Sequence, residues 1–243
     1  MSWREEAALL PNFSPRDFDL QPATTGLLLI DMQYVDAHRE YGLGKSLKES
    51  HPAVWDYYFT RVEEIVVPGC KRLLEAFRDA GMRVVHVTIG PELPDGADMV
   101  PLRRPAVAPG LESMLHGRGS FEHRILEQLE PRPGELVVNK TSRGAFNSTA
   151  IERLLLNLGL DGLVVAGVST SSCVETTARD AADRGWKVVI VEDATAELDE
   201  PSHDATLRQF AVRFGRVWTV EETLSVLGLS GAAPAMSPGS LRA

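Results

Sequence analysis

The sequence predicts a single α/β domain built around a mostly parallel sheet of six strands. Short apolar runs alternate with longer segments of helical periodicity, which is the pattern of parallel strands joined by right-handed helical crossovers. Several runs are apolar at every position, as expected of strands that are covered on both faces. The six expected strands are residues 26–30, 82–89, 135–139, 163–166, 187–191 and 215–220.

Length and composition support one soluble globular unit without an internal repeat. The chain has 243 residues, 44% of them hydrophobic and 24% charged, which is enough for one large domain with a sizeable core. Its formal net charge of −9 argues against a nucleic-acid or anionic membrane surface as partner. No apolar run is long enough for a transmembrane helix, and the N-terminus lacks a signal-peptide core. With only two cysteines, we expect a reducing, cytoplasmic setting.

The ends of the chain differ in character from the middle. Residues 1–22 contain three prolines and predict an irregular N-terminal arm that packs on a partner subunit or stays loose. Residues 23–229 form the predicted domain, and the low-complexity residues 230–243 predict a disordered tail. Residues 32–60 are rich in aromatic side chains without clear periodicity, so we expect a long irregular excursion that acts as a lid.

Helices are expected between the strands. A helix over 61–80 has Pro68 near its start and Gly81 as its stop signal. A helix over 148–157 is capped by Ser148 or Asn147. Two further helices are expected, one running from Cys173 toward Trp186 and one over 201–214.

The stretch LVVAGVSTSSCV at 163–174 reads as a buried strand, a tight turn and the first turn of a helix that contains Cys173. The first N–H groups of a helix lack intrahelical partners and carry the positive end of its dipole. We therefore expect the pKa of the thiol to lie below its usual value of about 8.5, with the same N–H groups free to bind an oxyanion. The plainer alternative is a buried cysteine that acts as a small hydrophobe.

Three reactive side chains follow three of the expected strands. Asp31 follows the first strand, Lys140 the third and Cys173 the fourth, and the carboxyl ends of parallel strands share one sheet edge. Together they suggest a nucleophilic site in which Asp31 takes the thiol proton, Lys140 supplies a balancing charge and Cys173 attacks a carbonyl carbon. Separately, Asp31 could cap a loop, Lys140 could lie on the surface, and Cys173 could be inert.

Over about residues 24–225 the sequence resembles the isochorismatase-like cysteine hydrolases, whose relatives include N-carbamoylsarcosine amidase, biuret hydrolase and nicotinamidase. The resemblance is carried by LLLIDMQ around Asp31, VVNKTSRGAFNSTAIERLL around Lys140 and VVAGVSTSSCVETTARDAADRGWKVVIVEDA around Cys173. It implies a Rossmann-like, three-layer αβα fold, a Cys–Asp–Lys triad and an acyl-cysteine intermediate. It also implies a cis peptide bond between Val168 and Ser169, with the N–H groups of Ser169 and Cys173 forming an oxyanion hole.

The resemblance raises the question of a metal, because nicotinamidases carry an Asp-x-His metal motif. Asp36-Ala37-His38 has the right letters but lies only five residues beyond Asp31, closer than that family places it. The remaining histidines show no ligand spacing, and His86 falls in a strand. We therefore expect no metal and no cofactor.

Since Cys173 is present, the resemblance favours C–N bond cleavage in a small linear amide or ureido compound. Lactams and nicotinamide-type amides are the alternative substrates, and we expect a homo-oligomer, either a dimer or a tetramer. Candidate substrate-binding residues are Gln33, Tyr34 and Phe146, together with Arg103 and Arg104, which would suit a substrate carboxylate.

Two other functions remain to be weighed. A binding protein that kept the fold without turnover would be expected to lack one of the three reactive residues. A thiol redox protein needs a resolving cysteine, but Cys70 lies in a predicted helix far from Cys173 in sequence, and no CxxC motif occurs.

Overall fold

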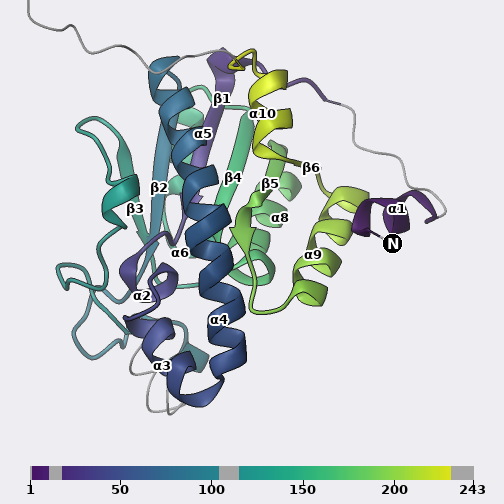
Figure 1. Ribbon diagram of the computed structural model, residues 1–243. Coiled ribbons are helices and arrows are strands. Elements are labelled where there is room, and N and C mark those ends of the chain that lie inside the picture. The colour runs from purple at the N-terminus through teal and green to yellow at the C-terminus, as the bar shows by residue number, and fades with distance from the viewer. Residues whose placement is uncertain (1, 11–17, 104–114, 231–243) are drawn as a thin grey trace, which may run out of the picture.

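The computed structural model describes residues 2–10, 18–103 and 115–230 (Figure 1). Its centre is a six-stranded sheet in the order β3-β2-β1-β4-β5-β6, and every neighbouring pair is parallel. The α/β fold with a parallel sheet is therefore confirmed. The strands are β1 (Thr25–Ile30), β2 (Arg83–Ile89), β3 (Leu136–Lys140), β4 (Gly162–Val168), β5 (Lys187–Ala196) and β6 (Arg216–Trp218).

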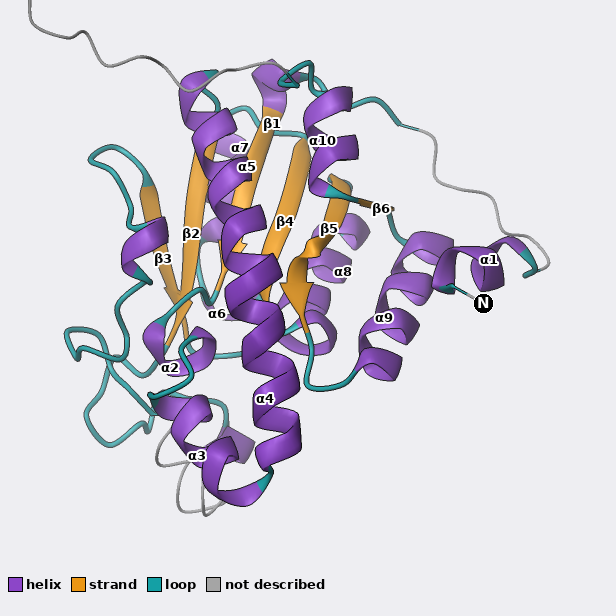
Figure 2. Cartoon of the chain, viewed as in Figure 1, coloured by secondary structure: helices purple, strands orange, loops and turns teal. Residues whose placement is uncertain are grey.

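Helices cover both faces of the sheet and give three layers (Figure 2). One face carries α4 (Pro52–Arg61), the π-helical turn Val62–Val66, α5 (Val67–Asp79) and α10 (Val220–Val226), and the other carries α6 (Ala145–Ser148), α7 (Ile151–Asn157), α8 (Glu175–Asp183) and α9 (Glu200–Arg213). Strand β1 is buried at all six positions and contributes side chains to the hydrophobic cores on both faces of the sheet. Leu27 and Leu29 pack toward α5, whereas Leu28 and Ile30 pack toward α8 and α9.

The aromatic-rich segment 32–60 is helical, so the irregular excursion expected from its composition is wrong. It forms α2 (Tyr34–Ala37), α3 (Gly42–Ser50) and α4. Its aromatic side chains mostly face inward: Tyr58 is 1% exposed, and the indole N–H of Trp55 donates to the carbonyl of Arg39 at 3.1 Å. Burial of these rings, which no local periodicity shows, fixes the helices.

Helices α4 and α5 are joined without a break by the π-helical turn. The helix expected to start near Pro68 therefore begins at Pro52. Pro52 takes the first helical position, where a missing N–H is harmless. Pro68 lies just after the π-helical turn, where the regular hydrogen-bond ladder is already interrupted. The helix ends as expected at Gly81, whose φ is +67°.

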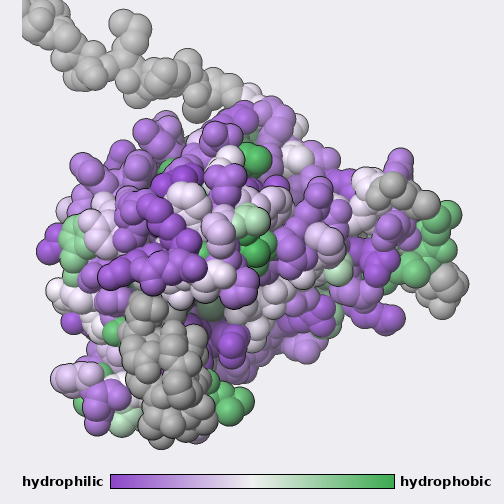
Figure 3. Space-filling view, turned by 60° about the horizontal axis from the view of Figure 1, so that its bottom comes forward, coloured by the Kyte–Doolittle hydropathy of each residue, from purple (hydrophilic) through white to green (hydrophobic). Residues whose placement is uncertain are grey.

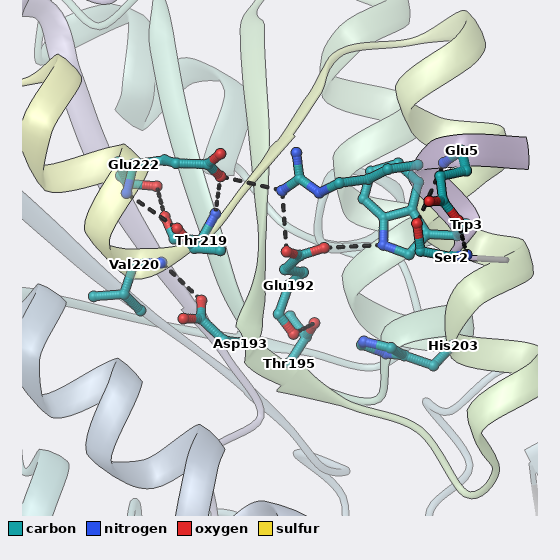
Figure 4. Close-up of polar contacts among 12 residues, drawn as sticks. Ser2, Trp3, Glu5, Glu192, Asp193, Thr195, His203, Thr219, Val220 and Glu222 are labelled. Atoms are coloured by element: carbon teal, nitrogen blue, oxygen red, sulfur yellow. Dashed lines mark hydrogen bonds and ion pairs between the residues drawn. The ribbon is translucent and has the colours of Figure 1, made fainter. Parts of the chain in front are cut away.

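The start of the chain is also more ordered than predicted. Residues Trp3–Ala8 form α1, which begins with a reciprocal capping box between Ser2 and Glu5. The Trp3 indole N–H donates to Glu192 Oε2 at 2.9 Å, and Figure 4 shows the indole pointing at that carboxylate. This part of the expected loose arm therefore docks on its own chain.

The expected helix 148–157 begins only at Ile151, as α7, and the separate short helix α6 precedes it. Ser148 is not its cap, because its Oγ accepts a hydrogen bond from the Thr141 N–H at 3.2 Å. Thr149 Oγ1 instead accepts from the Ile151 N–H at 3.0 Å, at the start of α7. The predicted tail falls outside the described residues from 231 onward. Within the described ranges, every helix is too short or too polar to cross a lipid bilayer.

All six strands point the same way, so their carboxyl ends gather at the lower edge in Figure 1. Next to that edge, Gly167 of β4 pairs with Ile30 of β1. Gly167 has a φ of +119°, and a Cβ there would lie 2.1 Å from the carbonyl oxygen of Ile30. Glycine is therefore required at this position, directly beside the strand end that carries Asp31.

Candidate active site

Asp31 and Lys140 form a buried ion pair at the carboxyl edge of the sheet. Lys140 is the last residue of β3, and its Nζ reaches past β2 to Asp31 Oδ2 at 2.8 Å. The side chains are 0% and 1% exposed, respectively. Asp31 has a φ of +50°, a sparsely populated conformation for a residue with a Cβ and one that clusters at functional sites.

The ion pair leaves one carboxylate oxygen unused. Asp31 Oδ1 is buried and accepts no hydrogen bond from any described residue. Burial alone would lower the pKa of Lys140, but the charge of Asp31 outweighs this and raises it. The ammonium therefore stays protonated.

Cys173, the third reactive residue, lies in the π-helical turn Thr170–Val174 just before α8. Burial, followed by the negative charge of Asp31, raises the pKa of its thiol to about 12. The lowered pKa expected from the helix start is therefore wrong. Cys173 is only 7% exposed, and Asp31 is nearby. Desolvation and repulsion by the carboxylate destabilise its thiolate more than the helix dipole stabilises it.

Cys173 and Asp31 line a cavity of about 190 Å³. That volume lies below the roughly 300–1,000 Å³ typical of sites for drug-sized ligands, so it suits a small substrate. The cavity is lined by Asp31, Asp36, Leu43, Tyr58, Ile89, Arg103, Arg143, Val168, Ser169, Ser172 and Cys173. Figure 3 turns this lower side of the molecule forward, and its visible surface outside the grey atoms is mostly hydrophilic.

The turn that carries Cys173 is fixed from behind by polar side chains. Glu197 Oε2 accepts from the Ser171 N–H at 2.7 Å, and Thr170 Oγ1 lies 2.9 Å from His203 Nδ1. Arg61 Nη2 contacts His203 Nε2 at 3.0 Å. Arginine only donates, so Nε2 accepts and Nδ1–H donates to Thr170. Burial and the Arg61 charge lower the pKa of His203 to about 3, so the imidazole ring is neutral near pH 7.

The peptide bond between Val168 and Ser169 is cis, as the resemblance implied. Ser169 lies at the end of β4 and lines the cavity beside Cys173.

Three of the predicted substrate-binding residues lie elsewhere. Gln33 is fully buried, and its amide is saturated: Nε2 donates to the carbonyls of Ile89 and His123, and Oε1 accepts from the Ile89 N–H at 2.7 Å. Phe146 packs in the core, with its ring centre 5.5 Å from that of Trp186. Tyr34 lines a different cavity.

That second cavity is larger, about 660 Å³, and its lining includes Tyr34, Phe121 and His123. Its lining contains none of Asp31, Lys140 and Cys173. It lacks the reactive groups, so we place the candidate site in the smaller cavity.

The arginines divide differently from expectation. Arg103 lines the small cavity, whereas Arg104 lies outside the described residues. Arg143 also lines the cavity, and sequence reasoning missed it although it follows Lys140 by only three positions. Asp36 was missed as well, because it was considered only as part of a metal motif.

The metal motif is not assembled in this structure. Asp36 faces the small cavity, whereas His38 Nδ1 accepts from the Glu40 N–H at 3.2 Å and its ring packs on Tyr34 and Tyr41. Among the described residues, no group of three or more His, Cys, Asp or Glu side chains is placed to hold a metal ion.

A parallel α/β sheet with a thiol, a carboxylate and an ammonium at the carboxyl ends of its strands defines a candidate thiol-dependent hydrolase. The comparison with known families makes this specific. The Isochorismatase domain model matches residues 25–222, and the chain belongs to the isochorismatase family.

Individual relatives agree with this assignment. The chain is 29% identical to the ureidoacrylate amidohydrolase RutB of Agrobacterium fabrum over 231 residues, covering 90% of this chain and 96% of the relative. It is 32% identical to the maleamate amidohydrolase of Pseudomonas putida over 156 residues, covering 64% and 71%. A cysteine hydrolase from Pseudomonas syringae pv. phaseolicola 1448A shares the fold, with a TM-score of 0.73, 24% identity and coverage of 88% and 97%.

Proposed function

We propose that this protein is a cysteine amidohydrolase that cleaves the C–N bond of a small linear amide or ureido compound. The observation that carries the proposal is the buried Asp31–Lys140 pair: Asp31 keeps one carboxylate oxygen without a partner among the described residues and lines one cavity with Cys173. The relatives named for ureidoacrylate and maleamate hydrolysis support the bond type.

In the proposed first step, Sγ of Cys173 attacks the substrate carbonyl carbon while Asp31 takes the thiol proton. A thiol with a pKa of about 12 is protonated at rest, so a base must act as the S–C bond forms. The N–H groups of Ser169 and Cys173 would stabilise the resulting oxyanion. Lys140 keeps its charge and balances the carboxylate.

In the following steps, the C–N bond breaks and the leaving nitrogen takes the proton from Asp31. Ammonia or an amine departs, leaving an acyl group on Cys173. Asp31 then accepts a proton from water, whose oxygen attacks the acyl carbon. The C–S bond breaks, and Sγ takes the proton back from Asp31. Arg103 and Arg143 at the cavity would bind a carboxylate on the substrate.

We further propose that the enzyme needs no metal or cofactor and works in the cytoplasm as a homo-oligomer. Both cysteines are free thiols, which fits a reducing compartment. Strand β3 is an edge of the sheet, and Val137 on it is 44% exposed, which fits contact with a second copy.

An ammonia-release screen tests the proposed reaction. It would compare ureidoacrylate, N-carbamoylglycine, biuret, maleamate and nicotinamide. A lactam and the vinyl ether isochorismate, whose hydrolysis releases no ammonia, are followed by mass analysis of the products. We expect activity on at least one linear amide or ureido compound, retained after exhaustive chelation and abolished by Cys173→Ala. Hydrolysis of isochorismate alone, or equal activity of Cys173→Ala, would contradict the proposal.

A further inference from the structure

Asp36 is a second carboxylate in the small cavity, and the proposed chemistry does not use it. It lines the cavity together with Asp31, Arg103 and Cys173. Its Oδ2 is buried, and no described residue donates a hydrogen bond to it. Leaving a buried acceptor of this kind unpaired is costly, so the site is built to receive a donor from outside the protein.

The backbone holds Asp36 in place. The N–H groups of Asp36 and Ala37 donate to the carbonyl of Gln33 at 3.2 and 2.8 Å, and Gln33 itself is clamped to the end of β2. On the other side, the buried Tyr58 hydroxyl donates to the carbonyl of Asp36 at 3.2 Å. The backbone that carries the Asp36 carboxylate is therefore held from both sides.

The protonation state of Asp36 decides which ligand group can bind it. Burial and the nearby charge of Asp31 raise the pKa of Asp36 to about 7, against the opposing charges of Arg103 and Lys140. None of these groups hydrogen-bonds to its Oδ2. An ionised carboxylate is an acceptor only, so its partner on the ligand must be an N–H or O–H group.

A ureido group offers N–H donors on both sides of its carbonyl carbon. Asp31 serves the nitrogen that leaves, and a second carboxylate is available for the nitrogen that stays. We propose that Asp36 binds the retained N–H of a ureido acid, whose carboxylate lies toward Arg103 and Arg143. This inference rests on the proposed function and narrows its substrate class from amides in general to ureido acids.

A matched pair of ligands tests the inference. N-carbamoylglycine and succinamate have the same length and charge, but the first has an N–H where the second has a CH₂. Binding of each is measured by calorimetry to Cys173→Ala, which binds without turnover, at about one pH unit above the pKa of Asp36. Asp36→Leu and Asp36→Asn are added to that background, and Asp56→Asn, an exposed position on α4, is the matched control.

We expect Cys173→Ala to bind N-carbamoylglycine more tightly. Asp36→Leu should weaken that binding roughly 10- to 100-fold relative to succinamate, as for loss of a hydrogen bond to a charged group. Asp36→Asn keeps a neutral acceptor, so its affinity ratio for the two ligands should lie between those of Cys173→Ala and Asp36→Leu. Asp56→Asn should leave the binding of both ligands unchanged. Loss of the Asp36 charge affects both anionic ligands alike, so it cancels in the ratio.

Equal binding of the two ligands, or a ratio unchanged by Asp36→Leu, would overturn the inference, as would failure to bind either. None of these results depends on turnover, so the ammonia-release screen can succeed while this inference fails. Folding is checked by urea unfolding. A buried acid with a raised pKa costs stability above its unfolded pKa of about 3.9, so both Asp36 variants should be at least as stable as their parent at alkaline pH.

Discussion

Replacing Lys140 with Met should destabilise the fold and abolish activity. Lys140 and Asp31 are 0% and 1% exposed and meet at 2.8 Å, so the substitution leaves a carboxylate buried without its cation. Removing one partner of such a pair typically costs about 3–5 kcal/mol. Replacing both in Lys140→Met/Asp31→Leu removes the uncompensated charge, so the double variant should regain part of that loss in stability while remaining inactive.

The pH dependence separates this cause from simple loss of packing. The raised pKa of Lys140 means that its contribution in the unmodified protein is fully present below about pH 10 and is lost only as pH rises further. Lys140→Met lacks this ammonium, so the difference in unfolding free energy between the variant and its parent should be smaller at about pH 11 than at about pH 8. Urea unfolding at both values measures it. A penalty that is equal at both values, or a double variant less stable than Lys140→Met, would refute the reasoning.

Two further predictions follow from the shifted pKa values. Without substrate, alkylation of Cys173 by iodoacetamide should rise about tenfold per pH unit from pH 7 to 10, because a thiol with a pKa of about 12 is protonated throughout that range. Mass mapping should find Cys70 unlabelled in the folded protein, since it is fully buried, and a rate that levels off below pH 9 would show instead that the helix start dominates. His203→Leu should cost about 2 kcal/mol or more at pH 8, because Arg61 and Thr170 lose a buried partner. The lowered pKa of His203 means that its contribution is present above about pH 6.5 and is lost as pH falls toward 3, so the difference between variant and parent should narrow by pH 4. A gap that stays constant would contradict the neutral state assigned to the buried ring.

The sheet was predictable because its signals are local. Apolar runs such as 26–30 and 163–166 identify buried strands without knowledge of their neighbours, and parallel strands must bring their carboxyl ends to one edge. The meeting of Asp31 with Lys140 follows from that rule. Segment 32–60 gave no such signal, because its helices are held by rings that pack against distant parts of the chain.

The details of the site depend on side-chain direction and burial, which periodicity does not encode. Gln33 is only two residues beyond Asp31, yet its amide turns into the protein and is saturated there, whereas Asp36 turns toward the cavity. The thiol pKa of Cys173 was predicted in the wrong direction for the same reason. The helix start is visible in the sequence, but the desolvation and the carboxylate that outweigh it come from the tertiary fold.

The account depends on a covalent bond between Cys173 and the substrate. Rapid acid quench of the working enzyme, followed by mass analysis of the peptide that contains Cys173, tests this directly. We predict a mass increase equal to the acyl group, formed and lost at rates compatible with turnover and absent from Asp31→Asn. Sustained turnover with Cys173 unmodified, or with the acyl group on another residue, would contradict the account.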